Sequence, residues 1–302
     1  MYKTLFSRTA ILLLSLAFAA CSAATPPQSQ QSNPNASPPV NQPETTKSEA
    51  AQKVVALTPL TADIIYQLDK TKLVGIPGNK LVSSNPNFTG ITTVTADRTP
   101  PNLEKIIALK PDLVVGATGF HDKTMEKLQQ LGIKTLLTQI DSWKSLEDLT
   151  TTLAKSLNAN PEPLLKRYQT FLADIPAQSP ATLVLASRQP ILSPNKASWA
   201  GDLLDKFNVT NIAAKLQGES PMRGYITLSA EKVLEANPEV IIIVDRGEGM
   251  LEEFKSDSFW NKLQATKNNR IYIFDYYGLV NPGSIEKIEE ATSELKKVLA
   301  KK

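Results

Sequence analysis

NLEKIIALKPDLVV at residues 102–115 and SAEKVLEANPEVII at residues 229–242 align over fourteen positions without a gap. Each copy begins with a capping residue, Asn102 or Ser229, has a glutamate two positions later, and ends its short helix at a proline before an apolar strand. Asn and Ser caps accept hydrogen bonds from free backbone N–H groups, a first-turn carboxylate meets the positive end of the helix dipole, and proline cannot continue the helix. Joints of helix, proline and strand are common, but a match of this length exceeds what such a joint requires. The repeat therefore predicts two related lobes.

Short apolar segments alternate with helix-period segments through the rest of the chain. A helix is expected from Thr58-Pro59 through Leu68, because proline suits the first helical turn. Strands are expected at residues 54–57, 73–76, 112–115, 133–137, 182–186 and 271–274. This alternation is typical of an α/β fold with mostly parallel sheets, which is the fold class predicted for both lobes.

The connection between the lobes is expected near residues 142–178. Ser142–Leu157 has a strongly helical pattern, and Pro161 suits the first position of a second helix that runs to about Asp174. The predicted division is an N-terminal lobe at residues 53–158, a connecting backbone helix at residues 159–178 and a C-terminal lobe at residues 179–302.

The chain begins with the features of an export signal. Lys3 and Arg8 supply positive charge before the apolar run Ala10–Ala20, which is short for a transmembrane span. The run ends in small residues before Cys21, the single cysteine, a pattern that resembles the bacterial lipobox. We expect a signal peptide at residues 1–20 and a lipidated Cys21. Ordinary signal cleavage nearby is the alternative.

Residues 21–52 are expected to form a tether that holds the folded body off a membrane. The segment is rich in Pro, Ser, Gln, Asn and Thr, and it lacks the apolar surface needed to offset chain entropy. With Cys21 lipidated, the mature domain has neither a disulfide nor a thiolate metal site. The net charge is only +3 and no basic tract stands out, which argues against a nucleic-acid partner.

The order and spacing of the motifs resemble those of a known family. The quoted repeat is similar to sequences of the periplasmic solute-binding proteins of ABC importers, in the siderophore, haem and vitamin B12 class. So are VVALTPLTADIIYQL, SWAGDLLDKFNVTNIA and the ending RIYIFDYYGLVNPGSIEKIEEATSELKKVL. The resemblance implies two α/β lobes joined by a single rigid helix, a ligand cleft between the lobes, and delivery of a small molecule to a membrane permease. We expect a monomer.

The resemblance also implies two contact residues for the permease. In relatives, the glutamate that starts the repeated helix of each lobe docks on permease arginines, which corresponds to Glu104 and Glu231 here. The alternative is that both glutamates act only as partners of the helix dipole. The opening helix has Thr61-Ala62-Asp63 where many relatives carry a glutamate.

Cationic and aromatic side chains fall on the loops expected at the cleft, where open α/β sheets bind ligands. Guanidinium groups bind carboxylate or catecholate oxygens, and aromatic rings cover flat or bulky apolar parts. The mixture predicts a ferric siderophore or a ferric carboxylate complex as ligand, although any single residue can instead be a solvated or packing group. The candidate ligand-binding residues are Arg98, Arg188, Trp199, Arg223, Tyr225, Arg246, Tyr276 and Tyr277.

Other functions stay open from the sequence. Haem would need an axial ligand such as Tyr276 or Met222, and cobalamin would favour more aromatic residues and fewer arginines. The pair Tyr276-Tyr277 could bind bare Fe³⁺ as phenolates. His121 is the only histidine, cannot form a metal cage alone, and is expected on the surface at a helix start. No phosphate-binding loop or nucleophile motif is present, so neither an enzyme nor a cofactor is expected. An envelope sensor or assembly protein on the same fold is the remaining alternative.

Overall fold

The computed structural model of the chain describes residues 49–96, 99–177, 179–216, 222–247 and 249–300. The predicted signal peptide, Cys21 and most of the predicted tether lie outside the described residues, as does Arg98. Residues 48–302 form one compact unit. Within its described part, no helix is both long enough and apolar enough to cross a bilayer.

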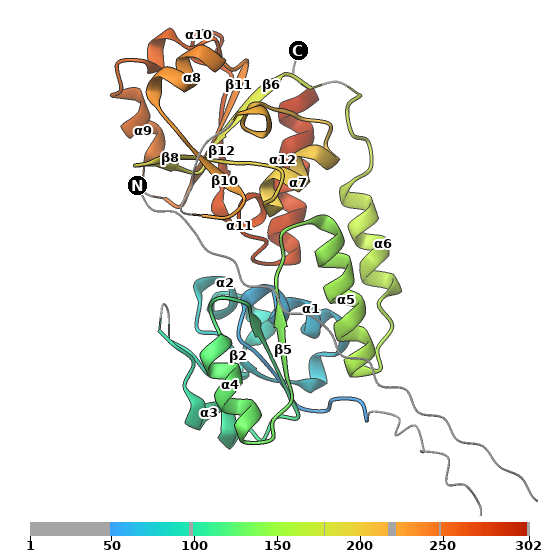
Figure 1. Cartoon of the computed structure of the whole chain (residues 1–302). Helices are drawn as coiled ribbons and strands as arrows, with labels where there is room; N and C mark the ends of the chain where they lie inside the picture. Colours follow the sequence, from blue (N-terminus) through green and yellow to red (C-terminus); the bar gives the residue numbers. More distant parts are fainter. Residues whose placement is uncertain (1–48, 97–98, 178, 217–221, 248, 301–302) are drawn as a thin grey trace, which may run out of the picture. The chain divides into compact units, whose positions relative to one another are not determined.

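The first lobe is built on a five-stranded parallel sheet with the strand order β3-β2-β1-β4-β5 (Figure 1). Val54, Val55 and Ala56 of β1 are fully buried at the centre of the sheet, as expected for a strand covered by helices on both faces. The strands are β1 (Val54–Ala56), β2 (Leu73–Ile76), β3 (Thr92–Thr93), β4 (Leu113–Ala117) and β5 (Thr135–Thr138). The helices are α1 (Pro59–Asp69), α2 (Lys80–Ser83), α3 (Leu103–Ala108) and α4 (Asp122–Gln130).

The second lobe contains a four-stranded parallel sheet, β12-β11-β6-β9, and a three-stranded antiparallel sheet, β10-β8-β7. The antiparallel sheet was not expected from the sequence, because its strands are short and flank turns. The strands are β6 (Ala181–Leu185), β7 (Ser187–Arg188), β8 (Ile191–Pro194), β9 (Thr210–Asn211), β10 (Tyr225–Leu228), β11 (Val240–Asp245) and β12 (Ile271–Asp275). The helices are α7 (Trp199–Lys206), α8 (Ala230–Ala236), α9 (Met250–Lys255), α10 (Gln264–Lys267), the kinked α11 (Tyr276–Leu279) and α12 (Ile285–Ala300).

The internal repeat corresponds to one equivalent joint in each lobe, α3–β4 in the first and α8–β11 in the second. Asn102 accepts a hydrogen bond from the backbone N–H of Lys105 at 2.9 Å, and Ser229 accepts the equivalent bond from Lys232 at 3.2 Å. In both copies the residue before the proline has positive φ, +49° at Lys110 and +37° in the second copy. Proline disfavours the right-handed helical region for its predecessor, so both helices end in the same way. The prediction of an α/β fold with two lobes is confirmed.

Two helices, α5 (Trp143–Leu157) and α6 (Glu162–Phe171), lie side by side along one flank of both lobes (Figure 1). Helix α5 begins at a capping box, in which the side chains of Ser142 and Ser145 each bond to the other residue's backbone N–H. The helix expected from Pro161 to about Asp174 is α6, which ends at Phe171.

One hydrophobic cluster is shared by both lobes, beside a smaller cluster within each lobe. One cluster of buried side chains contains Leu60 of α1, Leu146 of α5, Leu203 of α7 and Ile288 of α12, all at most 5% exposed. Both lobes and the connecting helices therefore pack on a shared interior, which fixes the walls of the space between them.

Candidate functional site

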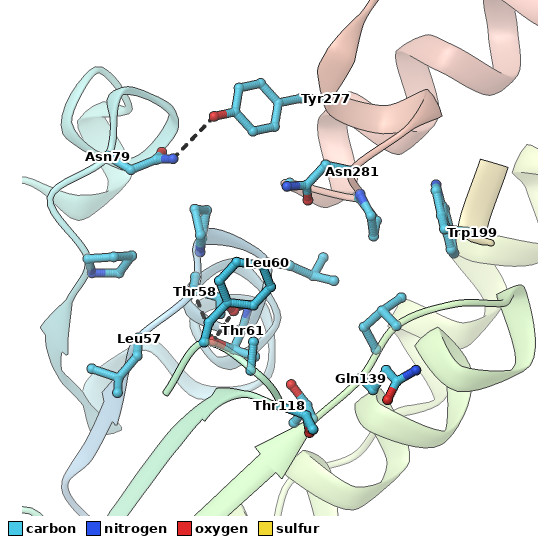
Figure 2. Close-up of a pocket in the computed structure, with 18 of the residues that line it drawn as sticks. Leu57, Thr58, Leu60, Thr61, Asn79, Thr118, Gln139, Trp199, Tyr277 and Asn281 are labelled. Atoms are coloured by element: carbon cyan, nitrogen blue, oxygen red, sulfur yellow. Dashed lines mark hydrogen bonds between the residues drawn. The ribbon is translucent and has the colours of Figure 1, made fainter. Parts of the chain in front are cut away.

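A cleft of about 740 Å³ lies between the lobes (Figure 2). Lobe 1 lines it with the segments that follow β1, β4 and β5, the carboxyl ends at which open α/β sheets bind ligands. Lobe 2 lines it with the start of α7, the segment before β10 and the turn after β12. The two lobes thus supply opposite walls of a single site.

Several helices begin at the cleft, among them α2, whose cap Asn79 lines it. The lining includes the caps of α1 (Thr58), α4 (His121) and α7 (Ser198), and Asp141 next to the cap of α5. The first turn of α1 contains no acidic residue that would offset the positive end of its dipole, whereas the carboxylate of Asp202 accepts from the backbone N–H of Trp143 at the start of α5. The start of α1 therefore adds positive potential to the cleft that a count of arginines does not reveal.

Three tyrosines of lobe 2 lie together at the cleft. The rings of Tyr276 and Tyr277 meet edge to face with centroids 5.3 Å apart, and the guanidinium of Arg246 lies 3.8 Å from the centroid of the Tyr276 ring. Tyr225 is 7% exposed, and its pKa is raised by burial and further by the neighbouring Tyr276. These rings form a wall of the cleft in which the phenol of Tyr225 stays neutral.

Trp199 is held by packing as well as lining the cleft. Its side chain is 3% exposed, its Nε1–H donates to the carbonyl of Gly278 at 2.8 Å, and its ring stacks on Trp143 at 5.9 Å. Trp143 begins α5, so this stack joins the connecting helices to lobe 2. The tryptophan position predicted at a helix start is confirmed, and only part of its ring is left for a ligand.

The arginines predicted from sequence are not all brought together. Arg223 lines the cleft with a 75% exposed side chain and lies 3.9 Å from Asp141 of the opposite lobe. Arg246 is not among the lining residues, but its guanidinium lies over the ring of Tyr276, which does line the cleft. Arg98 lies outside the described residues, although Ala96 and Thr99 on either side of it line the cleft.

Arg188 lies away from the cleft lining, in strand β7. It donates two hydrogen bonds to Asp257, at 2.8 and 3.2 Å, and Glu253 lies 3.8 Å away. The bond to Asp257 raises the pKa of the guanidinium. Arg188 does follow the first strand of lobe 2, β6, as expected. It does not reach the ligand side, because it anchors α9 and the following turn to the small antiparallel sheet.

Much of the lining is neutral and polar, which the sequence reasoning missed. Threonine hydroxyls and side-chain amides from lobe 1 surround the cleft, including Thr58, Thr61, Asn79, Thr118 and Gln139 (Figure 2). The amide of Asn79 donates to the hydroxyl of Tyr277 at 3.4 Å across the cleft. The sequence feature that could have identified these residues is their position, because each lies in a segment that follows a strand of lobe 1.

His121 does not lie on the outer surface, where the sequence predicts it. It does begin a helix, but its ring is half-buried and lines the cleft rather than the outer surface. Its Nδ1 accepts a hydrogen bond from the backbone N–H of Ala117 at 2.9 Å. Burial lowers the pKa of the imidazole, so the ring is neutral at pH 7. Within the described residues, no group of three or more His, Cys, Asp or Glu side chains is arranged to hold a metal ion.

Glu104 and Glu231 occupy matching positions in the two lobes. Each lies in the first turn of its helix, α3 or α8, and each is exposed. Hydrogen bonds from the backbone of the first helical turn and from Ser229 lower the pKa of Glu231. Both carboxylates are therefore available to a partner, and their role in docking stays a prediction.

The chain is similar to proteins of known type over most of its length. A family model described as "Periplasmic binding protein" matches residues 54–277. The "Fe(3+)-citrate-binding protein YfmC" of Bacillus subtilis is 26% identical over 77% of this chain and 76% of its own length. The "Uncharacterized ABC transporter substrate-binding lipoprotein YvrC" of the same species is 26% identical, over 84% and 83%. The fold resembles that of Staphylococcus aureus IsdE in complex with heme, with a TM-score of 0.67, 21% identity, and 82% and 99% coverage.

Proposed function

This chain belongs to the periplasmic binding protein family, and on that premise we propose that it is the substrate-binding lipoprotein of an ABC importer for a ferric siderophore or ferric carboxylate complex. Relatives named as an Fe(3+)-citrate-binding protein and as an ABC transporter substrate-binding lipoprotein support this proposal. These relatives are named for transport rather than for an enzymatic activity.

The observation that carries the proposal is the convergence of helix N-termini on an aromatic cleft between two lobes. The positive end of α1, together with Arg223, favours a ligand with negative charge on its surface. The rings of Tyr225, Tyr276 and Tyr277 favour a ligand with apolar bulk. A ferric complex of an organic chelator combines these two properties.

The size of the cleft agrees with a ligand of this class. Binding sites for small molecules have volumes of about 300–1,000 Å³, and this cleft measures about 740 Å³. Its neutral hydroxyl and amide groups can donate to ligand oxygens without the desolvation cost of buried charges. The lining thus supports a chelate of low net charge more than a polyanion.

Haem is the second candidate. Met222 lies on the lobe 2 side of the cleft with 47% of its surface exposed, and Tyr276 also lines the cleft. Thioether and phenolate groups are both known types of axial haem ligand. Haem binding would give a Soret absorption band, which a colourless or hydroxamate-bound protein lacks.

Delivery requires contact with a permease and a place at the membrane. Exposed carboxylates such as Glu104 and Glu231 can set the register of docking by pairing with basic groups of a partner. Lipidation at Cys21 would keep the protein outside the cytoplasm at the membrane surface. Radiolabelled fatty acid incorporated by the native chain and lost in Cys21→Ser tests this anchor.

The ligand can be identified by tryptophan fluorescence, because Trp199 lines the cleft. The chain from residue 21, with Cys21→Ser, is titrated with ferric citrate, ferric hydroxamates, ferric catecholates, haem and cobalamin. Saturable quenching by a ferric chelate at submicromolar concentration is the expected result. Saturation by haem or cobalamin alone would replace the iron-chelate proposal, and flat titrations throughout would move the function to a different solute or to a protein partner.

A further inference from the structure

The segment after β4 forms a tight turn at the rim of the cleft. The backbone N–H groups of Phe120 and His121 both donate to the carbonyl of Ala117, at 3.2 and 3.0 Å, and Gly119 takes a φ of +81° that favours glycine. Ala117, Phe120 and His121 all line the cleft. The turn therefore brings two consecutive side chains to the ligand side of lobe 1.

The hydrogen bond to Ala117 defines which nitrogen of His121 carries the proton. Because Nδ1 accepts from the backbone N–H at 2.9 Å, the proton of the neutral ring resides on Nε2. In the described part of the chain, no acceptor lies within hydrogen-bonding distance of Nε2. His121 thus brings one N–H donor to the cleft without a partner among the described residues.

The ring is also held in place by packing. A Cβ atom at Gly116 would lie 3.0 Å from the Cβ of His121 and 2.4 Å from the methyl group of Met125, so only glycine leaves room for the histidine there. Burial, which lowers the pKa of the imidazole, keeps it in the neutral form that this geometry requires. The donor is therefore fixed in direction before any ligand arrives, which reduces the entropy lost on binding.

Phe120, the neighbouring residue, is 86% exposed although it is a large apolar side chain. It is the most exposed of the large apolar side chains in the described residues and makes no core contact that would explain its presence. Leu131 at the other end of α4 is 59% exposed but does not line the cleft. The position of Phe120 at the rim gives its ring a free face toward a ligand.

We infer that Phe120 and His121 form a specificity subsite that binds the organic arm of the chelate. In this subsite the Phe120 ring covers a hydrocarbon or aromatic segment of the ligand, and the Nε2–H of His121 donates to a carbonyl or carboxylate oxygen beside that segment. The inference rests on the proposed function and narrows it. The ligand class is an amphiphilic chelate, such as a hydroxamate with methylene spacers, rather than ferric citrate, which has no apolar arm.

The same hydrogen bond argues against His121 as a metal ligand. A histidine that ligates a metal through Nε2 carries its proton on Nδ1 and donates it to a carbonyl or carboxylate. Here Nδ1 faces a donor, the N–H of Ala117, so ligation through Nε2 would break that bond. His121 is accordingly a hydrogen-bonding residue in this subsite and not an axial ligand.

Two substitutions at His121 separate the binding role from the structural role. In His121→Asn the amide oxygen takes the place of Nδ1, which keeps the acceptor for Ala117 and removes the donor in the cleft. In His121→Gln the amide nitrogen takes the place of Nε2, which keeps the donor and removes the acceptor for Ala117. Phe120→Ala removes the exposed ring, and Leu131→Ala is its matched control outside the cleft.

The test measures affinity for ferrioxamine B and ferric citrate by fluorescence, and thermal stability without ligand, for the chain from residue 21 with Cys21→Ser. We expect the unsubstituted protein to bind ferrioxamine B more tightly than ferric citrate. His121→Asn should weaken ferrioxamine B binding about tenfold with little change in melting temperature, because one hydrogen bond to the ligand is lost at a half-buried position. His121→Gln should show the reverse pattern. Phe120→Ala should weaken ferrioxamine B binding about three- to tenfold and ferric citrate binding much less.

The possible results separate a failure of the proposed subsite from a failure of the proposed function. If the unsubstituted protein binds a chelate and both His121→Asn and Phe120→Ala bind it equally well, the subsite is wrong and the proposed function stands. The subsite is also overturned if Leu131→Ala weakens binding as much as Phe120→Ala. If the unsubstituted protein gives flat titrations with both chelates but saturates with a ferric catecholate, the subsite fails and the proposed function stands, whereas flat titrations with every ferric chelate end both.

Discussion

The carboxylate of Asp63 in α1 accepts a hydrogen bond from the backbone N–H of Ile285, the first residue of α12, at 2.7 Å. A side chain of lobe 1 thus satisfies a free N–H group at the start of the last helix of lobe 2. The reverse contact also exists, because Asp202 of α7 accepts from the backbone N–H of Trp143 at the start of α5 at 2.7 Å. Carboxylates stabilise helix N-termini through both the hydrogen bond and the dipole. These two contacts tie the lobes together behind the cleft.

Removal of the Asp63 carboxylate should destabilise the whole protein. Asp63→Ala leaves the buried N–H of Ile285 without its acceptor, which costs about 1–3 kcal/mol, whereas Asp63→Asn keeps an acceptor oxygen. We expect the free energy of unfolding in urea to fall by that amount in the alanine variant and by less in the asparagine variant. Equal losses in the two variants would mean that the charge, and not the hydrogen bond, matters at this position.

The pH dependence of stability should report on the same carboxylate. Burial raises the pKa of Asp63 above its ordinary value, with the hydrogen bond from Ile285 acting in the opposite direction. The folded protein therefore binds this proton more tightly than the unfolded chain, so the stability gained is fully present below the unfolded pKa of about 3.9. It is lost as the pH rises through the folded pKa. Urea denaturation across this interval should show the stability of the native protein declining relative to Asp63→Asn, and a constant difference would contradict the raised pKa.

The two arginines Arg223 and Arg188 should differ in their effect on binding. Arg223→Ala removes a cation from the cleft lining and should weaken binding of a ferric chelate about three- to tenfold, consistent with its exposed position. Arg188→Ala removes a cation whose partners are Asp257 and Glu253, and should leave the affinity unchanged while lowering the melting temperature. Isothermal titration and differential scanning calorimetry on both variants check this. A loss of affinity in Arg188→Ala would mean that Arg188 does contact the ligand.

The fluorescence signal of ligand binding should come from the Trp143–Trp199 stack. Trp199 lines the cleft and stacks on Trp143, whereas Trp260 is buried in a separate cluster of lobe 2. Trp199→Phe should therefore remove most of the quenching caused by a ferric chelate, and Trp260→Phe should retain it. Quenching that persists unchanged in Trp199→Phe would place the ligand elsewhere.

The fold was largely predictable because its signals are local. The repeat at Asn102 and Ser229 carries its own caps and prolines, so sequence spacing is enough to define two equivalent joints. The short strands β7 and β8 were missed, since their pairing is antiparallel around a turn and depends on β10 further along the chain.

The site was predictable in position but not in charge. The segments after the strands could be identified, and Trp199, Arg223, Tyr225, Tyr276 and Tyr277 do line the cleft. The partner of Arg188 could not be inferred, because Asp257 lies 69 residues away in sequence. The inward position of His121 depends on a close approach to Gly116 that has no sequence signature. Long-range pairing and side-chain orientation are three-dimensional properties that residue type alone does not encode.

The core shared by Leu60, Leu146, Leu203 and Ile288 limits which parts of the protein recombination can exchange. The repeat relates the two halves, and each keeps a buried cluster of its own, but the opposite face of each parallel sheet packs into a shared interior. Recombination with a relative near residue 158 would therefore give a chimera with mismatched surfaces at α1, α5, α7 and α12. A new ligand preference can arise through substitutions in the turns at the cleft, such as the one after β4. The exchange of a whole lobe requires the side chains on both sides of the shared core to change together.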